Sequence, residues 1–195
     1  MKPLAFFDFD GTITSKDALY QFLFFSFPKI RLLSGFVFLA PFLVLHYGKM
    51  LSNAKMKQRV FAHFFRGLTI DAFQQLALRF CKEKLPEIIR KEAMDKIEWH
   101  KQQGHEIVVV SANFDQIFAP WCKENGLKII GTCLESKAGF LTGKFASLDC
   151  SGEEKVKRIK QQYALEKCEV IYAYGDTKGD LPMLALAHYP FYQKF

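Results

Sequence analysis

The sequence predicts an α/β fold, a Rossmann-like parallel sheet with a helical cap inserted after the first strand. Three largely apolar runs, at 4–7, 106–110 and 170–174, lack polar alternation, which is typical of strands buried on both faces. Each run ends in polar or glycine-containing residues, where open parallel sheets place their ligands. The long stretch between the first two runs has helical periodicity instead.

The first strand, 4–7, leads into Asp8-Phe9-Asp10-Gly11-Thr12. In an extended chain Asp8 and Asp10 point to the same side. Gly11 permits a tight turn, and Thr12 can offer its hydroxyl and amide to an anion. A simple hairpin turn at Asp10-Gly11 is the plain alternative. It is disfavoured because no alternating strand follows.

The second strand, 106–110, delivers Ser111 and Asn113 at its end. A helix is expected to follow as far as about residue 125, with Gly126 as its stop. A hydroxyl beside a helix N-terminus suits a phosphate oxygen.

The segment Ser151-Gly152-Glu153-Glu154 has the form of a capping box, so Lys155 falls in the first turn of a helix. A lysine there works against the helix dipole, which indicates a functional role. We expect the neighbouring Lys157, Arg158 and Lys160 to form a solvated face.

The last strand, 170–174, is followed by Asp176 and Asp180. Each carboxylate alone could be a turn residue or a helix cap. Together with the other strand ends, they favour a phosphate site.

These segments resemble the four motifs of the haloacid dehalogenase (HAD) superfamily of phosphatases, over residues 8–180. Within it they resemble subfamily IB, the branch with phosphoserine phosphatases and the phosphatidylglycerophosphatase C type. The segments 134–136, 139–144 and 150–156 are similar to that branch. From the residues alone, they predict a hairpin that turns near Ala138-Gly139, followed by a helix.

The resemblance implies that Asp8 is the nucleophile, forming an aspartyl-phosphate, and that Asp10 is the general acid and base. It also implies a Mg²⁺ ion held by Asp8, the backbone carbonyl of Asp10, and Asp176.

By the same resemblance, Ser111 and Lys155 bind phosphoryl oxygens, and Asp180 orients Lys155 or a metal-bound water. Thr12 and Asn113 are further candidates for phosphate contact.

Asp10 helps to distinguish a phosphatase from other members of the superfamily. Dehalogenases of the superfamily lack a carboxylate two places after the nucleophile, and its cation-pumping ATPases have threonine there, so Asp10 argues against both. A phosphomutase would keep both aspartates and stays open. A phosphate-binding module without activity is disfavoured, because the nucleophile and the acid are both present.

We expect residues 16–85 to form the cap, and 1–15 with 86–195 to form the catalytic core. Apolar residues recur at helical spacing in the cap; they are Met56, Val60, Phe64, Phe73, Leu76, Ala77, Phe80 and Cys81. A helix over 87–103, stopped by Gly104, is expected to lead back into the core. Asp17 lies where phosphoserine phosphatases place an acidic residue near the substrate amine.

Basic residues gather in the cap and its exit helix: residues 14–100 contain 14 Lys and Arg against 7 Asp and Glu. The same region has an apolar run at 32–45, interrupted by Gly35 and Pro41 and shorter than the roughly 20 residues of a membrane span. Either it lies at a membrane interface, or it forms a core hairpin or homodimer surface. No nucleic-acid motif accompanies the basic residues.

The remaining features favour a cytoplasmic enzyme, either free or peripheral at the inner face of a membrane. Its five cysteines are odd in number and unpaired in spacing, which indicates reduced thiols, and its five histidines form no ligand cluster. Residues 1–3 lead directly into the first strand and leave no room for a signal peptide. The expected substrate is a lipid phosphate such as phosphatidylglycerophosphate, or a phosphorylated small molecule such as phosphoserine.

Overall fold

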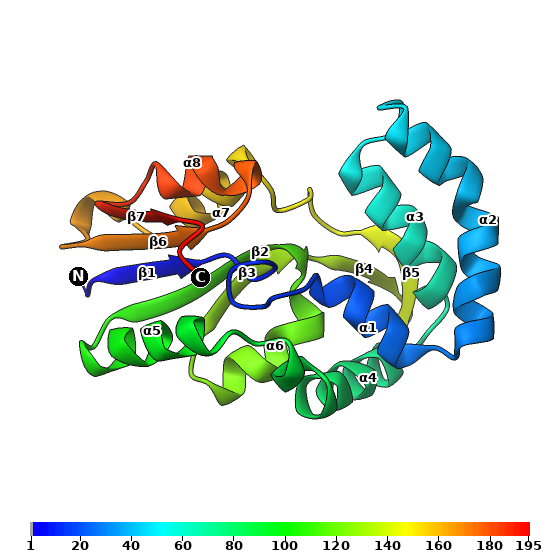
Figure 1. Ribbon diagram of the computed structural model, residues 1–195, viewed down its shortest axis with the longest axis horizontal. Coiled ribbons are helices and arrows are strands. Elements are labelled where there is room, and N and C mark those ends of the chain that lie inside the picture. The colour runs from blue at the N-terminus through cyan, green and yellow to red at the C-terminus, as the bar shows by residue number, and fades with distance from the viewer. Residues whose placement is uncertain (1) are drawn as a thin grey trace.

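A five-stranded parallel sheet forms the centre of the computed structural model (Figure 1), in the order β3-β2-β1-β6-β7. The structure describes residues 2–195, so the expectation that residues 1–3 lead directly into the first strand cannot be followed at Met1, which lies outside the described residues. The strands are β1 (Leu4–Phe7), β2 (Glu106–Phe114), β3 (Lys128–Thr132), β6 (Ile171–Gly175) and β7 (Tyr189–Tyr192). The predicted fold class is therefore confirmed.

The register brings the polar strand ends to one edge of the sheet. Phe7, the last residue of β1, pairs with Val109 of β2 and with Tyr174 of β6. The chain beyond Phe7 therefore lies between the segments that carry Ser111 and Asp176.

Helices cover both faces of the sheet (Figure 1), α5 (Lys91–Gln102) and α6 (Asp115–Glu124) on one face, α7 (Glu153–Gln162) and α8 (Leu181–Leu184) on the other. Alternate residues of β1 face these two layers, which explains its unbroken apolar sequence. Ala5 and Phe7 belong to one buried cluster, while Leu4 and Phe6 belong to the other.

The first four of the five α-helices between β1 and β2 in the sequence lie in the right-hand part of Figure 1. They are α1 (Ala18–Ser26), α2 (Lys29–Tyr47), α3 (Asn53–Phe65) and α4 (Ile70–Glu83). The helical periodicity predicted for α3 and α4 is confirmed, because its apolar positions are buried apart from the partly exposed Leu76; the buried ones are Met56, Val60, Phe64, Phe73, Ala77, Phe80 and Cys81.

A hairpin of β4 (Leu134–Lys137) and β5 (Phe140–Phe145) packs against α3, and it turns at the predicted Ala138-Gly139. Its backbone continues the pairing onto the loop between α3 and α4. Leu141 N donates to Leu68 O, Gly67 N to Leu141 O, and Ile70 N to Gly139 O, each at 2.9 Å. The hairpin is therefore tied to the helical insertion, although in sequence it follows β3.

The apolar run at 32–45 lies within α2, which continues through Gly35 and Pro41 as one helix of 19 residues. Gly35 allows close packing on α3, where a Cβ atom would come 2.3 Å from Phe64 Cζ. Pro41 removes one backbone donor and crowds the preceding turn of the helix, and α2 packs against α3, which can offset this cost.

Two boundaries and one helix cap differ from expectation. Strand β2 extends to Phe114, and α5 begins at Lys91, since a 3₁₀ turn, Leu85–Glu87, contains Pro86 and precedes it. The prediction of a capping box at Ser151 is also wrong. Gly152, at φ 57°, occupies the N-cap of α7, and the Ser151 hydroxyl donates to the Asp149 carboxylate instead.

The solvated face predicted on α7 is wrong for Arg158. Its guanidinium is buried and donates to the carbonyls of Gly131 and Leu148 and to Glu154. Lys157 and Lys160 are exposed, as expected.

Candidate active site

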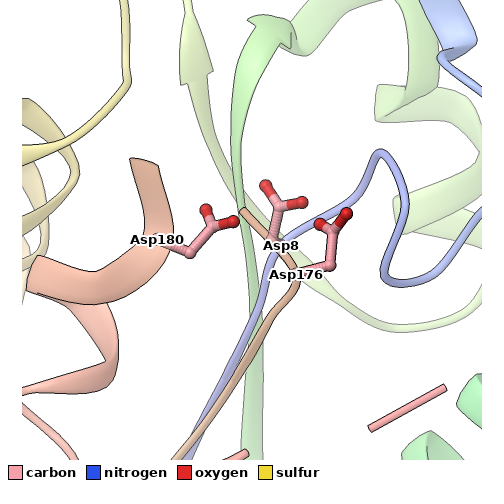
Figure 2. A group of neighbouring side chains, drawn as sticks. All are labelled: Asp8, Asp176 and Asp180. Atoms are coloured by element: carbon pink, nitrogen blue, oxygen red, sulfur yellow. The ribbon is translucent and has the colours of Figure 1, made fainter. Parts of the chain in front are cut away.

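Three carboxylates converge beyond the end of the sheet (Figure 2). Asp8 follows β1, Asp176 follows β6, and Asp180 ends the short 3₁₀ turn Lys178–Asp180. One oxygen from each lies within 4.8 Å of the others. Asp8 and Asp180 are buried, and Asp176 is partly buried.

Lys155 joins two of these carboxylates. Its ammonium lies 2.5 Å from Asp8 Oδ1, 2.6 Å from Asp180 Oδ1 and 2.7 Å from the carbonyl oxygen of Val110. Burial alone would lower the pKa of Lys155, but Asp8 and Asp180 raise it above its usual value. The first turn of α7 therefore delivers a charged ammonium into the site, as its position in the sequence indicates.

Asp180 is fixed by hydrogen bonds on both oxygens. Beyond Lys155 at Oδ1, its Oδ2 accepts the Thr177 amide at 2.9 Å and the Thr177 hydroxyl at 2.7 Å. Burial alone would raise the pKa of Asp180, but Lys155 and these donors hold it below its usual value. An anionic Asp180 can hold Lys155 in place.

The Asp10 carboxylate accepts three hydrogen bonds: from Ala18 N at 2.6 Å, Asn113 Nδ2 at 2.8 Å and Ser111 Oγ at 3.3 Å. Burial, with further effects of Asp17 and Asp8, raises the pKa of Asp10 to about 8. The carboxyl group therefore carries its proton at neutral pH, as a general acid must.

Burial also raises the pKa of Asp8, to about 6, against the opposing effect of Lys155. Asp8 thus titrates below Asp10. Two neighbouring carboxyl groups with separated pKa values are the usual basis for a division between nucleophile and acid.

Ser111 and Asn113, the predicted phosphate contacts on β2, lie beside Asp10 here. The Ser111 hydroxyl also accepts the Asn113 amide at 3.0 Å. The pairing of β2 with β3 shifts register between Val110 and Phe114, the segment that holds both residues.

Thr12 and Gly11 form the turn around Asp176. Thr12 Oγ1 lies 3.2 Å from Asp176 Oδ1 and 3.5 Å from Asp8 Oδ2, so its hydroxyl contacts carboxylates. Gly11 has φ 86°, and a Cβ atom there would come 2.2 Å from Asp176 Oδ2. Both the backbone conformation and the available space require glycine at this position.

A cavity of about 150 Å³ opens over these groups, and the helical insertion contributes Asp17 and Lys57 to its wall. Asp17 caps α1, accepting Leu19 N at 2.9 Å and Tyr20 N at 3.1 Å. The structure therefore places this predicted residue at the cavity.

Lys57 was missed by sequence reasoning. Its ammonium bonds Ala112 O at 2.8 Å and Asp149 Oδ1 at 2.5 Å, and so links α3 to the sheet side of the cavity. A signal existed: Lys57 shares helical spacing with Val60, Phe61 and Phe64, which are buried on α3.

The donor set suits a hard divalent cation. Asp8 and Asp176 offer carboxylate oxygens, and burial raises the pKa of both groups, so a cation would offset their crowding. Asp180 is near enough to join them, but Lys155 and Thr177 already engage both of its oxygens. The residues present therefore fit Mg²⁺ bound mainly by Asp8 and Asp176.

Comparison with known proteins identifies the family of the chain. A family model described as haloacid dehalogenase-like hydrolase matches residues 5–185. The chain is 31% identical over 194 residues to protein CicA of Caulobacter vibrioides, covering 98% of this chain and 86% of that protein. It is 29% identical over 215 residues to a histidinol-phosphatase of Neisseria meningitidis serogroup C, covering 97% and 89%.

Solved structures share the fold. A Bordetella pertussis protein of unknown function superimposes with a TM-score of 0.84 at 21% identity, over 96% of this chain and 87% of that chain. A phospho-aspartyl intermediate analogue of phosphoserine phosphatase superimposes with a TM-score of 0.64 at 19% identity, over 95% and 83%.

Proposed function

Because the chain belongs to the haloacid dehalogenase-like hydrolase family, we propose that it is a Mg²⁺-dependent phosphomonoesterase that acts through an aspartyl-phosphate. The observation that carries this proposal is the placement of Asp8. One of its oxygens is held by Lys155, and the neutral carboxyl group of Asp10 lies nearby. A nucleophile and a proton donor thus face one cavity.

In the first step an Asp8 oxygen attacks phosphorus, the bond from phosphorus to the ester oxygen breaks, and Asp10 gives that oxygen its proton. In the second step Asp10 takes a proton from water, which attacks phosphorus. The bond between Asp8 and phosphorus then breaks, releasing inorganic phosphate and restoring both carboxyl groups.

The surrounding residues stabilise charge and position. Lys155, held by Asp180, lies where it can neutralise charge on the phosphoryl oxygens. Ser111 and Asn113 orient Asp10 and can turn part of their hydrogen bonding toward the phosphoryl group. Mg²⁺ held by Asp8 and Asp176 would offset the repulsion between an anionic nucleophile and an anionic ester.

Two substrate classes each have a supporting observation. The cavity of about 150 Å³ with Asp17 in its wall favours a small ester with a cationic group, such as phosphoserine. The name of the histidinol-phosphatase relative points to the same class, an amino alcohol phosphate. The exposed apolar side of α2 favours a lipid phosphate such as phosphatidylglycerophosphate.

The test is turnover of these esters by wild type and Asp8→Asn, with and without detergent, beside a generic aryl phosphate. Asp8→Asn is expected to lose on the order of 10⁴-fold or more in kcat on every substrate, because the amide is a poor nucleophile. The wild type should also yield an acid-stable phosphorylated protein, and the variant none. A wild type inactive on the whole panel would contradict the proposal and favour a phosphate-binding module.

A further inference from the structure

Helix α2 leaves one apolar side uncovered. Leu32, Gly35 and Leu39 are buried against the rest of the insertion, whereas Ile30 is 74% exposed, Val44 71% and Tyr47 82%. Other exposed apolar side chains of α2 are Leu33, Val37, Phe38 and Leu45. Within residues 2–195, α2 alone is long and apolar enough to cross a membrane by length and composition, and only 17% of that stretch is buried.

A basic basin of about 910 Å³ lies between α3 and the β4–β5 hairpin. Its cationic lining residues are Lys55, Arg59, Arg66, Lys137 and Lys144. Glu135 is the one acidic residue that lines it, and Glu135 accepts the Thr142 hydroxyl at 2.5 Å. In the described part of the chain, none of the five cations forms an ion pair with a carboxylate.

The apolar side of α2 and the basin adjoin one another. The Arg59 guanidinium, on the rim of the basin, lies 4.0 Å from the centre of the Phe42 ring of α2. Leu51, which follows α2, also lines the basin. The basin therefore borders α2, and we call the exposed apolar side of α2 together with the basin the docking face.

Charge selects the partner of the docking face. Residues 18–70 contain seven Lys and Arg and no Asp or Glu. A second copy of the chain would bring the same positive charge against it. A bilayer of anionic phospholipid offers both an apolar layer for α2 and phosphate groups for the basin.

We propose that the docking face binds the surface of anionic phospholipid bilayers, with α2 lying in the membrane interface. Crossing the membrane would require α2 to leave α3, where Gly35 and Phe64 are in close contact. Lys29 and Arg31 lie in the first turn of α2 and Lys49 follows its end, as suits a helix that lies along the headgroups.

This inference is independent of the proposed reaction. Lys57 points from α3 into the active site, while Lys55 and Arg59 line the basin, so the two sites use different residues of one helix. Docking can therefore be tested without altering the residues assigned to catalysis.

The experiment is sedimentation with phosphatidylcholine vesicles that contain increasing phosphatidylglycerol, at low and high salt. Wild type should bind more as the anionic fraction rises and less as salt rises. The triple variant Ile30→Gln, Val37→Gln, Val44→Gln should bind about tenfold or more weakly, and so should Lys55→Gln, Lys137→Gln, Lys144→Gln.

A matched control removes three exposed lysines of α6 and α7 that do not line the basin, Lys123→Gln, Lys157→Gln and Lys160→Gln, and should bind like wild type. All variants should keep wild-type aryl phosphate turnover, which also reports their folding. The proposal is overturned if the wild type does not bind the vesicles, or if the control triple loses as much vesicle binding as the two docking-face triples. A dimer that the α2 triple abolishes, without vesicle binding, would assign the face to a second copy.

Discussion

The ammonium of Lys155 lies 2.5 Å from Asp8 Oδ1, and both groups are buried although 147 positions separate them in the chain. A buried cation between two carboxylates stabilises the site only while all the partners are present. This arrangement makes the site sensitive to loss of the lysine in two measurable ways.

Lys155→Met should lose most turnover and should also destabilise the fold by about 3 kcal/mol near pH 8, because Asp8 and Asp180 would remain buried without their cation. Without Lys155 the pKa values of both carboxyl groups should rise, so the folded variant would take up protons as pH falls. The stability difference from wild type should therefore shrink toward pH 5. Urea unfolding at both pH values measures it, and a constant difference would count against this account.

Asp10→Asn should slow hydrolysis of esters with poor leaving groups by about 10²–10⁴-fold, and activated aryl phosphates less, because a good leaving group needs little protonation. A series of phosphate esters of graded leaving-group pKa measures this. An equal loss across the series, with normal hydrolysis of the phosphorylated protein, would exclude the acid role. In wild type the pKa of Asp10, raised to about 8, should appear in the pH profile: the rate at which Asp8 is phosphorylated should fall above that pH.

Asp176→Asn should raise the Mg²⁺ concentration that gives half-maximal activity by about tenfold or more, because the metal would lose a carboxylate ligand. A chelator should abolish wild-type activity, and Mg²⁺ should restore it. Asp115→Asn is a matched control, since Asp115 is a carboxylate outside the cavity. An unchanged Mg²⁺ requirement in Asp176→Asn would remove that residue from the metal site.

His100 should make the fold less stable in mild acid. Its ring is buried, lies 3.1 Å from the Tyr174 hydroxyl and 2.8 Å from His105, and burial lowers its pKa to about 3. Unfolded histidine titrates near pH 6.5. As the pH falls from about 6.5 to 3, the unfolded chain therefore binds this proton before the folded chain does, and the stabilising effect of the neutral buried ring is lost.

Comparing the stability of wild type and His100→Gln from pH 7.5 to 4.5 isolates this effect from the carboxylates common to both. The glutamine variant should be less stable at neutral pH, and the difference should narrow in acid. A difference that grows as pH falls would contradict the assignment of a neutral buried ring.

The sheet and the main acidic residues were predictable because their signals are local. Apolar runs identify the strands, and parallel strands bring their carboxyl ends to one edge, which collects Asp8 and Asp176. Lys155 could be placed in a first turn from its neighbours alone, even though the expected capping box does not form.

Other features depend on tertiary contacts that spacing does not encode. Lys57 enters the active site because tertiary packing brings α3 within hydrogen-bond reach of Ala112 on β2, and Arg158 is buried because two backbone carbonyls accept its guanidinium. The continuity of α2 through Pro41 likewise depends on packing against α3, where helix propensity predicts a break.

The strand-like link between Leu68 and Leu141 has a consequence for exchanging parts between relatives. A chimera that transplants only residues 16–85 would separate α3 from the β4–β5 hairpin shaped to fit it, notably Gly143, where a Cβ atom would come 2.8 Å from Ala62 Cβ. The unit that can be inherited or exchanged intact is discontinuous: the four helices together with residues 134–145. Recombination at the two ends of residues 16–85 would leave residues 134–145 of that unit behind.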